Sequence, residues 1–246
     1  MPPQENRSPT KQKTTKTMKN KVDGILVVDK PMDWTSYDVV NCVKRRFNVE
    51  KVGHCGTLDP IATGLLVILL GKATKLQDQL MGQDKVYAAT MRLGLETDSE
   101  DRTGQVTATS DFSTITEAQI RETAAAFVGP QLQTPPMVSA IKLHGQPLYK
   151  LARKGQTVER QPREITIHSF AVTRIELPDV DFTVHCTKGT YVRTICADFG
   201  RRLGCGAHML ELRRIQSGNF NLNNAVTIDQ IKAWELPELI NHLLAV

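Results

Sequence analysis

The order of its apolar segments constrains this chain most. Residues 24–29 (GILVVD) and 65–70 form short, unbroken apolar runs of strand length, whereas residues 182–187 alternate apolar and polar side chains as a half-buried strand does. Residues 85–93 carry the β-branched and aromatic side chains of another strand. Because strands and helices do not alternate regularly along the chain, the sequence predicts an α+β fold with a mixed sheet rather than a doubly wound parallel sheet.

Helices are predicted between these strands. Ser36 is expected to cap a helix whose apolar residues recur at helical spacing from Val39 onward. Thr116 and Gln119 have the spacing of a capping box, in which each side chain bonds the other residue's backbone N–H, and they predict a second helix start. Gly189 leads into a third helix, so the end of a strand and the first turn of a helix lie close together there.

The common cofactor, metal and hydrolase motifs are absent from the sequence. No GxGxxG, HExxH or GxSxG occurs, and the five cysteines form no CxxC pair. The stretch 71–74 (GKAT) fails as a phosphate loop because Ala follows its lysine. We therefore expect no metal and no cofactor, with the thiols reduced in a cytoplasmic protein.

One polar loop concentrates the features of a reactive site. Residues 53–64 (GHCGTLDPIATG) contain three glycines, which permit tight turns and the close approach of a ligand. Pro60 biases Asp59 away from helix, and the loop enters the apolar run 65–70, so the Asp59 carboxylate is expected at the rim of a core strand. His54 is a nearby base or stacking group. Taken alone, an Asp-Pro pair is more often a turn than a catalytic site.

A second group of residues could act together with this loop. In residues 188–193 (KGTYVR), Arg193 follows a strand end and could hold a carboxylate through its forked guanidinium. A lone helical arginine is more often a surface charge, and Tyr87, in the middle of a predicted strand, is more often a core residue. None of these residues identifies an enzyme by itself.

Charge is distributed unevenly. The formal net charge is +5, and residues 1–22 hold six basic residues and one acid, which accounts for all of it. We interpret this segment as a disordered basic tail that is either a solvated leader or a nonspecific RNA-binding arm. Residues 141–163 carry six basic residues against one acid, and residues 189–218 carry five arginines against two acids. These two segments predict a basic face on a body that is neutral overall.

Five stretches stand in an order and spacing that together are highly specific. They are GHCGTLDPIATGLL (53–66), KVYAATMRLGLETDSEDRTG (85–104), PPMVSAIKLHGQPLYKLARKG (135–155), KGTYVRTICADFGRRLGCGAH (188–208) and LRR with a following Gly-Asn-Phe (212–220). In this combination the chain resembles the TruB family of tRNA pseudouridine synthases over about residues 23–235. The resemblance implies the pseudouridine synthase fold, a mixed and mainly antiparallel sheet flanked by helices and loops.

The resemblance also implies roles for individual residues. Asp59 would be the essential carboxylate, which either attacks the nucleoside or removes a ribose proton to give a glycal-like intermediate. Arg193 would form the ion pair that positions Asp59, and Tyr87 would stack on the uracil and could help remove its C5 proton. His54 would occupy the space that the flipped base leaves, and Lys30 would support the active-site loop or the RNA. The remaining expected RNA contacts are Gly56, Thr57, Lys142, Tyr149, Arg153, Lys188, Tyr191 and Arg214.

The expected substrate is uridine-55 in the TΨC loop of tRNA, extruded from its stack before it reacts. We expect a monomer without metal, cofactor or membrane contact.

The expected domain division is a tail over 1–22, a catalytic domain over 23–225 and a helical extension over 226–246, with no PUA-type RNA-binding domain. Two alternatives stay open: a guide-RNA-dependent pseudouridine synthase, and an RNA-binding or tRNA-folding chaperone.

Overall fold

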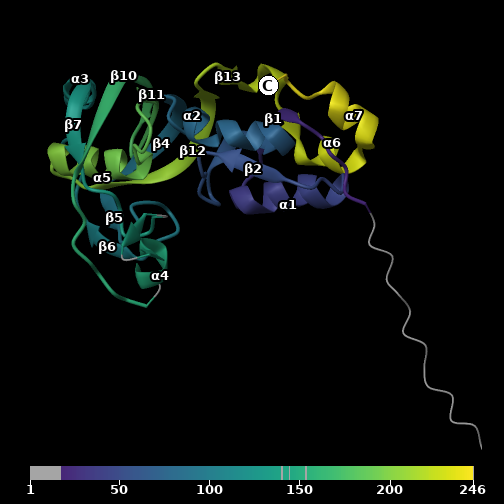
Figure 1. Ribbon diagram of the computed structural model, residues 1–246. Coiled ribbons are helices and arrows are strands. Elements are labelled where there is room, and N and C mark those ends of the chain that lie inside the picture. Colours follow the sequence, from purple (N-terminus) through teal and green to yellow (C-terminus); the bar gives the residue numbers. More distant parts are fainter. Residues whose placement is uncertain (1–17, 140, 144, 153, 246) are drawn as a thin grey trace, which may run out of the picture.

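A mixed sheet of ten strands forms the centre of the structure (Figure 1), a computed structural model that describes residues 18–139, 141–143, 145–152 and 154–245. Its strands are β1 (Gly24–Lys30), β2 (Val52–Cys55), β3 (Thr63–Leu70), β4 (Lys85–Leu93), β7 (Gly129–Gln133), β10 (Arg163–Glu176), β11 (Asp179–Cys186), β12 (Ala207–Ser217), β13 (Phe220–Asn221) and β14 (Val226–Thr227). The order is β14-β1-β3-β12-β4-β11-β10-β7, with β2 beside β3 and β13 beside β12. Only the β1–β14 and β3–β12 pairs of this sheet are parallel. The predicted α+β fold with a mixed, mainly antiparallel sheet is confirmed.

Helices and two small hairpins surround this sheet. The helices are α1 (Ser36–Arg46), α2 (Gln77–Met81), α3 (Glu117–Ala126), α4 (Leu148–Ala152), α5 (Val192–Leu203), α6 (Ile228–Ala233) and α7 (Leu236–Asn241), with 3₁₀ turns η1 (Gly71–Leu76) and η2 (Leu222–Asn224). The hairpins pair β5 (Leu95–Thr97) with β6 (Val106–Thr109) and β8 (Lys142–Leu143) with β9 (Gln146–Pro147). In Figure 1, α3 and α5 lie at the β7–β10 end of the sheet, and α1, α6 and α7 lie at the β1 end. No described helix is long and apolar enough to cross a membrane.

The central strand β3 shows why an unbroken apolar run was needed. It lies between β1 and β12, and both of its faces are covered. Leu66 and Ile68 join one hydrophobic cluster, whereas Leu65 and Val67 join a second cluster on the opposite face. Because successive side chains of a strand point to opposite faces, a strand buried on both sides must be apolar at every position.

The helix caps confirm one prediction and correct another. Thr116 and Gln119 form the predicted capping box at the start of α3. At α1 the cap is Thr35, whose side chain accepts a hydrogen bond from the backbone N–H of Asp38, and not Ser36 as predicted. Ser36 is buried, and its hydroxyl instead bonds the backbone of Leu58 in the polar loop. The two adjacent hydroxyl residues could not be distinguished from the sequence because either can cap a helix.

Segments at both ends of the predicted catalytic domain pack against its core. Residues 1–17 lie outside the described part of the chain, but residues 18–22, predicted to belong to the disordered tail, have an ordered place. Asn20 forms a β-bridge with Val49, and Val22 belongs to the core. At the other end, β14 pairs with β1, and Ile231 of α6 is fully buried in the same core. The predicted helical extension is thus packed into the catalytic body.

Candidate active site

The loop between β2 and β3 is fastened by residues distant in sequence. Lys30 donates a hydrogen bond from Nζ to the Pro60 carbonyl at 3.3 Å, and Ser36 Oγ accepts one from the Leu58 N–H at 2.9 Å. Arg214 donates from Nη2 to the carbonyl of Gly56 at 3.0 Å. The backbone is therefore held on both sides of Asp59, while the Asp59 carboxylate stays available for other contacts.

The structure shows why position 64, one of the three glycines in this loop, requires glycine. Its φ of +95° lies where only glycine is unstrained, and a Cβ at this position would collide with the backbone of Arg214 on β12. β3 and β12 are parallel neighbours there, with Arg214 opposite Gly64. The close approach of the two strands sets the loop over the centre of the sheet.

A cavity of about 270 Å³ opens beside this loop, close to the lower end of the size range of ligand pockets. Its walls come from the loop, from β4 and β12, and from the turn that leads into α5. The lining residues are Gly56, Thr57, Leu58, Asp59, Met81, Lys85, Tyr87, Ser139, Gly189, Thr190, Tyr191, Val192, Arg193, Met209, Leu212 and Arg214. The three residues predicted to be catalytic, Asp59, Tyr87 and Arg193, are all among them.

An ion pair joins the loop to α5. Arg193 Nη2 lies 2.9 Å from Asp59 Oδ2, and the arginine side chain is only 3% exposed, whereas the Asp59 side chain is 37% exposed. Burial raises the pKa of the Asp59 carboxyl, and the neighbouring Arg193 guanidinium opposes that rise. This geometry fixes the direction of a carboxylate that remains open to the cavity.

Arg193 makes further contacts that the sequence did not predict. Its Nη2 also donates to the Val138 carbonyl at 2.8 Å, and its Nη1 lies 3.5 Å from the carboxylate of Asp101. Asp101 is buried and accepts hydrogen bonds from the Ser99 hydroxyl at 2.7 Å and the Thr103 N–H at 2.9 Å. The guanidinium is thus held from two sides before any substrate arrives, which is the preorganisation that a positioning cation needs.

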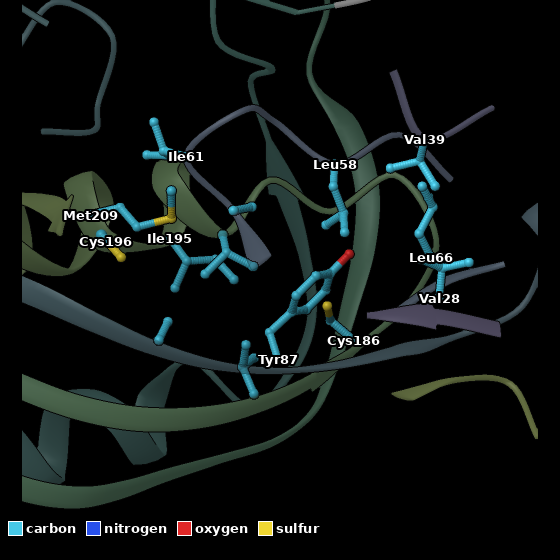
Figure 2. Close-up of a cluster of buried hydrophobic side chains, with 14 of the residues drawn as sticks. Val28, Val39, Leu58, Ile61, Leu66, Tyr87, Cys186, Ile195, Cys196 and Met209 are labelled. Carbon is cyan, nitrogen blue, oxygen red and sulfur yellow. The ribbon is translucent and has the colours of Figure 1, made fainter. Parts of the chain in front are cut away.

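Tyr87 lies where the cavity meets the core. It is 9% exposed, and Figure 2 shows its ring beside Cys186 with the hydroxyl directed toward Leu58. Arg214 is its partner across the β4–β12 ladder. Burial raises the pKa of the Tyr87 hydroxyl, although the Arg214 charge lowers it, so the side chain is a neutral phenol at neutral pH.

A second, wider hollow of about 760 Å³ adjoins the first and shares Thr57, Leu58, Asp59 and Ser139 with it. His54 lines this groove, and its buried Nδ1 has no partner among the described residues. Burial, aided by the Arg214 charge, lowers the pKa of His54. An uncharged ring therefore lies in the groove, and Asp59 is reached from both hollows.

Comparison with known proteins shows to which family the chain belongs. Residues 44–192 match the model of the TruB family pseudouridylate synthase N-terminal domain, and residues 193–244 match that of the tRNA pseudouridylate synthase B C-terminal domain. The chain belongs to the TruB family of pseudouridylate synthases. It is 52% identical to the tRNA pseudouridine synthase B of Opitutus terrae over 93% of this chain and 95% of that protein, and 49% identical to that of Syntrophotalea carbinolica over 89% and 72%. The family resemblance and the assignment as an isomerase are confirmed.

Solved structures agree on the fold. The TruB-family chain is similar to a chain of a Cbf5-Nop10-Gar1 complex, with a TM-score of 0.67 and 33% identity over 84% of this chain and 54% of that one. It is also similar to a chain of an H/ACA RNP bound to a substrate RNA containing 2′-deoxyuridine, with a TM-score of 0.63 and 30% identity over 84% and 51%. The TruB-family chain spans about half the length of those two chains.

The predicted RNA-contacting residues differ in where they lie in this TruB-family structure. Thr57 and Lys188 are exposed and Tyr191 is half-buried, and all three lie at or next to the cavity. Lys30 and Arg214 are fully buried, so neither can meet an RNA phosphate at the surface. Of the two roles kept open for Lys30, the structure favours loop support. Gly56 lines the cavity, whereas the side chains of Lys142 and Tyr149 and all of Arg153 lie outside the described residues.

Sequence reasoning missed Asp101 and Lys85. Asp101 lies within residues 85–104, one of the stretches that carry the family resemblance, but no spacing in the sequence indicated that it faces Arg193. Lys85 Nζ donates to the backbone carbonyls of Met81 and Gln83, which holds the turn at one wall of the cavity. A lysine that starts a strand two residues before Tyr87 lies on the same face as Tyr87, and this period of two could have indicated it.

Lys30 gives a testable dependence of stability on pH. Burial lowers its pKa from 10.5 to about 8, although the Asp59 charge opposes this. Between those values the unfolded chain holds a proton that the folded chain has lost, so the free energy of unfolding rises with pH across this window. From pH 8 to 10.5, we expect the free energy of unfolding of wild type to rise relative to that of Lys30→Met. The slope of this difference should approach about 1.4 kcal/mol per pH unit.

Urea unfolding at pH 8, 9 and 10 measures this difference. The Cys55 and Cys186 thiols, whose pKa burial raises to about 11, act equally in both proteins and cancel. A difference between wild type and Lys30→Met that stays constant with pH would show that Lys30 titrates as an exposed lysine does.

Proposed function

We propose that this chain converts uridine-55 in the TΨC loop of tRNA to pseudouridine, with Asp59 as the catalytic carboxylate. The observation that carries the proposal is the Asp59–Arg193 pair at a cavity that also contains Tyr87. The reaction is an isomerisation: the C1′–N1 bond breaks, the uracil turns, and C1′ bonds to C5, which loses its proton while N1 gains one. Relatives near 50% identity named tRNA pseudouridine synthase B support tRNA as the substrate.

The cavity suits a base that has left its stack. The reacting C1′ is inaccessible in a stacked nucleotide, so the nucleotide must be extruded, which costs a few kcal/mol and least in a loop. Asp59 lies between the small cavity and the groove that holds His54, and an extruded uridine would place its ribose there. His54 and Tyr191 offer rings on which bases of a single strand can stack.

The direct experiment is conversion of a bare TΨC stem-loop by the purified chain. We expect one uridine per stem-loop to become pseudouridine without guide RNA or partner protein, as measured by mapping pseudouridine in the product. Conversion of the stem-loop only after a guide RNA is added would overturn the proposal in favour of the guide-dependent alternative. The similarity to a chain of the Cbf5-Nop10-Gar1 complex is the reason to test that alternative.

A chaperone role can be separated from catalysis. If the protein also helps tRNA to fold, Asp59→Asn should accelerate tRNA refolding as well as wild type does, because the RNA-facing surface is unchanged. If tRNA refolds at the same rate with the Asp59→Asn protein added as it does with no protein, the chaperone role is removed. The proposed isomerisation is unaffected by that result.

Tyr87 is predicted to act through its hydroxyl as well as its ring. Tyr87→Phe keeps the buried ring, so we expect the free energy of unfolding to change by less than about 1.5 kcal/mol. If the hydroxyl takes part in removing the C5 proton, turnover should fall by about 10²-fold or more, the usual contribution of a positioned acid or base. Single-turnover kinetics test this, and turnover unchanged in Tyr87→Phe would restrict Tyr87 to stacking.

A further inference from the structure

Three potential metal ligands meet outside the cavity. Asp84 precedes β4, His168 belongs to β10 and His185 to β11, and one ligand atom from each lies within 4.8 Å of the others. His168 Nε2 is 2.9 Å from Asp84 Oδ2, and the rings of His168 and His185 have centroids 4.6 Å apart. Within the described residues, this is the one group of three His, Cys, Asp or Glu side chains so close together. His168 and His185 follow Asp84 by 84 and 101 positions in the sequence, so no local spacing indicates that the three residues meet.

An irregularity in the sheet brings the two histidines together. Along the β10–β11 ladder, Ile167 pairs with Cys186 and Ser169 pairs with His185, so His168 is an extra residue in β10. A β-bulge of this kind turns an additional side chain toward one face, and bulges recur where a side chain must be aimed. Without the bulge, His168 would be paired in the ladder and would alternate with its neighbours.

The cluster lies on the face of the sheet opposite the candidate active site. On β11, Val184 and Cys186 point into the core while His185, between them, points away. His185 pairs with Val86 on β4, whereas the neighbouring Lys85 and Tyr87 line the cavity. Since side chains alternate between faces, the cluster and the cavity lie on opposite sides of the same strands.

The donor set suits a transition metal. Two imidazole nitrogens and a carboxylate oxygen are ligands that zinc takes at about 2.0–2.2 Å, with water completing a four-coordinate site. Such bond lengths place ligand atoms roughly 3.4 Å apart, so the present separations need a small side-chain rotation. The side chains have room for it, because His168 is 37% and Asp84 is 43% exposed.

We propose that Asp84, His168 and His185 form a binding site for a divalent transition metal of the zinc class on the outer face of the sheet. A bound ion would tie the turn before β4 to β10 and β11. That turn ends at Lys85, which lines the cavity, so the site would brace the cavity wall from behind. It is independent of the proposed reaction, in which no step uses a metal.

Zinc binding to the full chain tests the site. The chain is stripped of metal with a chelator and titrated with zinc in competition with a chromophoric chelator. We expect one zinc per chain, and affinity reduced by at least about tenfold in His168→Ala, His185→Ala and Asp84→Asn, since loss even of an outer-shell partner costs that much. Asp84→Asn preserves the shape of the side chain, and circular dichroism checks that each variant is folded.

Two control variants make the result specific. His242→Ala removes an exposed histidine at the end of α7, and Cys42→Ser removes the half-buried free thiol that could also bind zinc. Both should bind zinc as wild type does. Cobalt(II) should give the intense visible absorption of a four-coordinate site in wild type and lose it in His185→Ala. Zinc that binds wild type and the three cluster variants equally, or no binding to wild type, would overturn the proposal.

Discussion

Asp59→Asn is expected to lower the rate of pseudouridine formation by at least about 10⁴-fold, the scale on which removal of a cooperating catalytic group acts. The amide has the shape of the carboxylate but cannot attack C1′ or accept a ribose proton, so the loss follows for either route. The measurement is release of tritium from a stem-loop labelled at C5 of its uridines, because the C5 hydrogen leaves when C1′ bonds there. Binding of the stem-loop should stay close to wild type.

A matched control separates catalysis from the loss of an ion pair. Asp179 forms a two-point pair with Arg92, at 2.7 and 2.8 Å, at a place outside the cavity lining. Asp179→Asn also removes a carboxylate from an arginine and should leave tritium release near the wild-type rate. Substantial turnover in Asp59→Asn would refute the assignment of Asp59, whereas equal losses in both variants would indicate a general effect of lost ion pairs.

Local patterns predicted the parts of this molecule that local physics decides. The apolar run 65–70 became the strand buried on both faces, and Thr116 with Gln119 became a helix cap. The candidate site could be predicted as residues but not as an arrangement, because Asp59 and Arg193 are brought together only by the sheet. A resemblance of motifs supplied what periodicity could not.

The parts that could not be predicted depend on burial and on long-range pairing. Lys30 and Arg214 are basic residues, the type that usually contacts RNA at a protein surface. Both are nevertheless fully buried, with backbone carbonyls as hydrogen-bond partners. Asp101 meets Arg193 of α5 across 92 positions of sequence, and the bulge that adds His168 to β10 is a shift in the register of β10 against β11. No single-sequence pattern encodes such register, since a shift of one residue reverses every side chain.

Arg193→Lys is expected to lower turnover by at least about 10²-fold, the cost of misplacing a reacting group by about 1 Å. The wild-type guanidinium reaches Asp59 and the Val138 carbonyl through Nη2 and Asp101 through Nη1. An ammonium group is a single charged centre on a flexible stem and cannot hold all three directions. Single-turnover tritium release measures the loss, with Arg92→Lys as the control for an arginine whose partner lies outside the cavity.

Arg193→Met tests the same pair through stability and pH. Removing one partner of a buried pair costs about 3–5 kcal/mol, and the loss should fall at the lower end because Asp59 is partly exposed. With the cation gone, burial and the nearby Asp101 charge both raise the pKa of Asp59. Since catalysis needs the ionised carboxylate, the acid limb of the pH–rate profile for residual activity should move to higher pH. An unmoved limb, together with full stability in urea, would show that Arg193 does not set the state of Asp59.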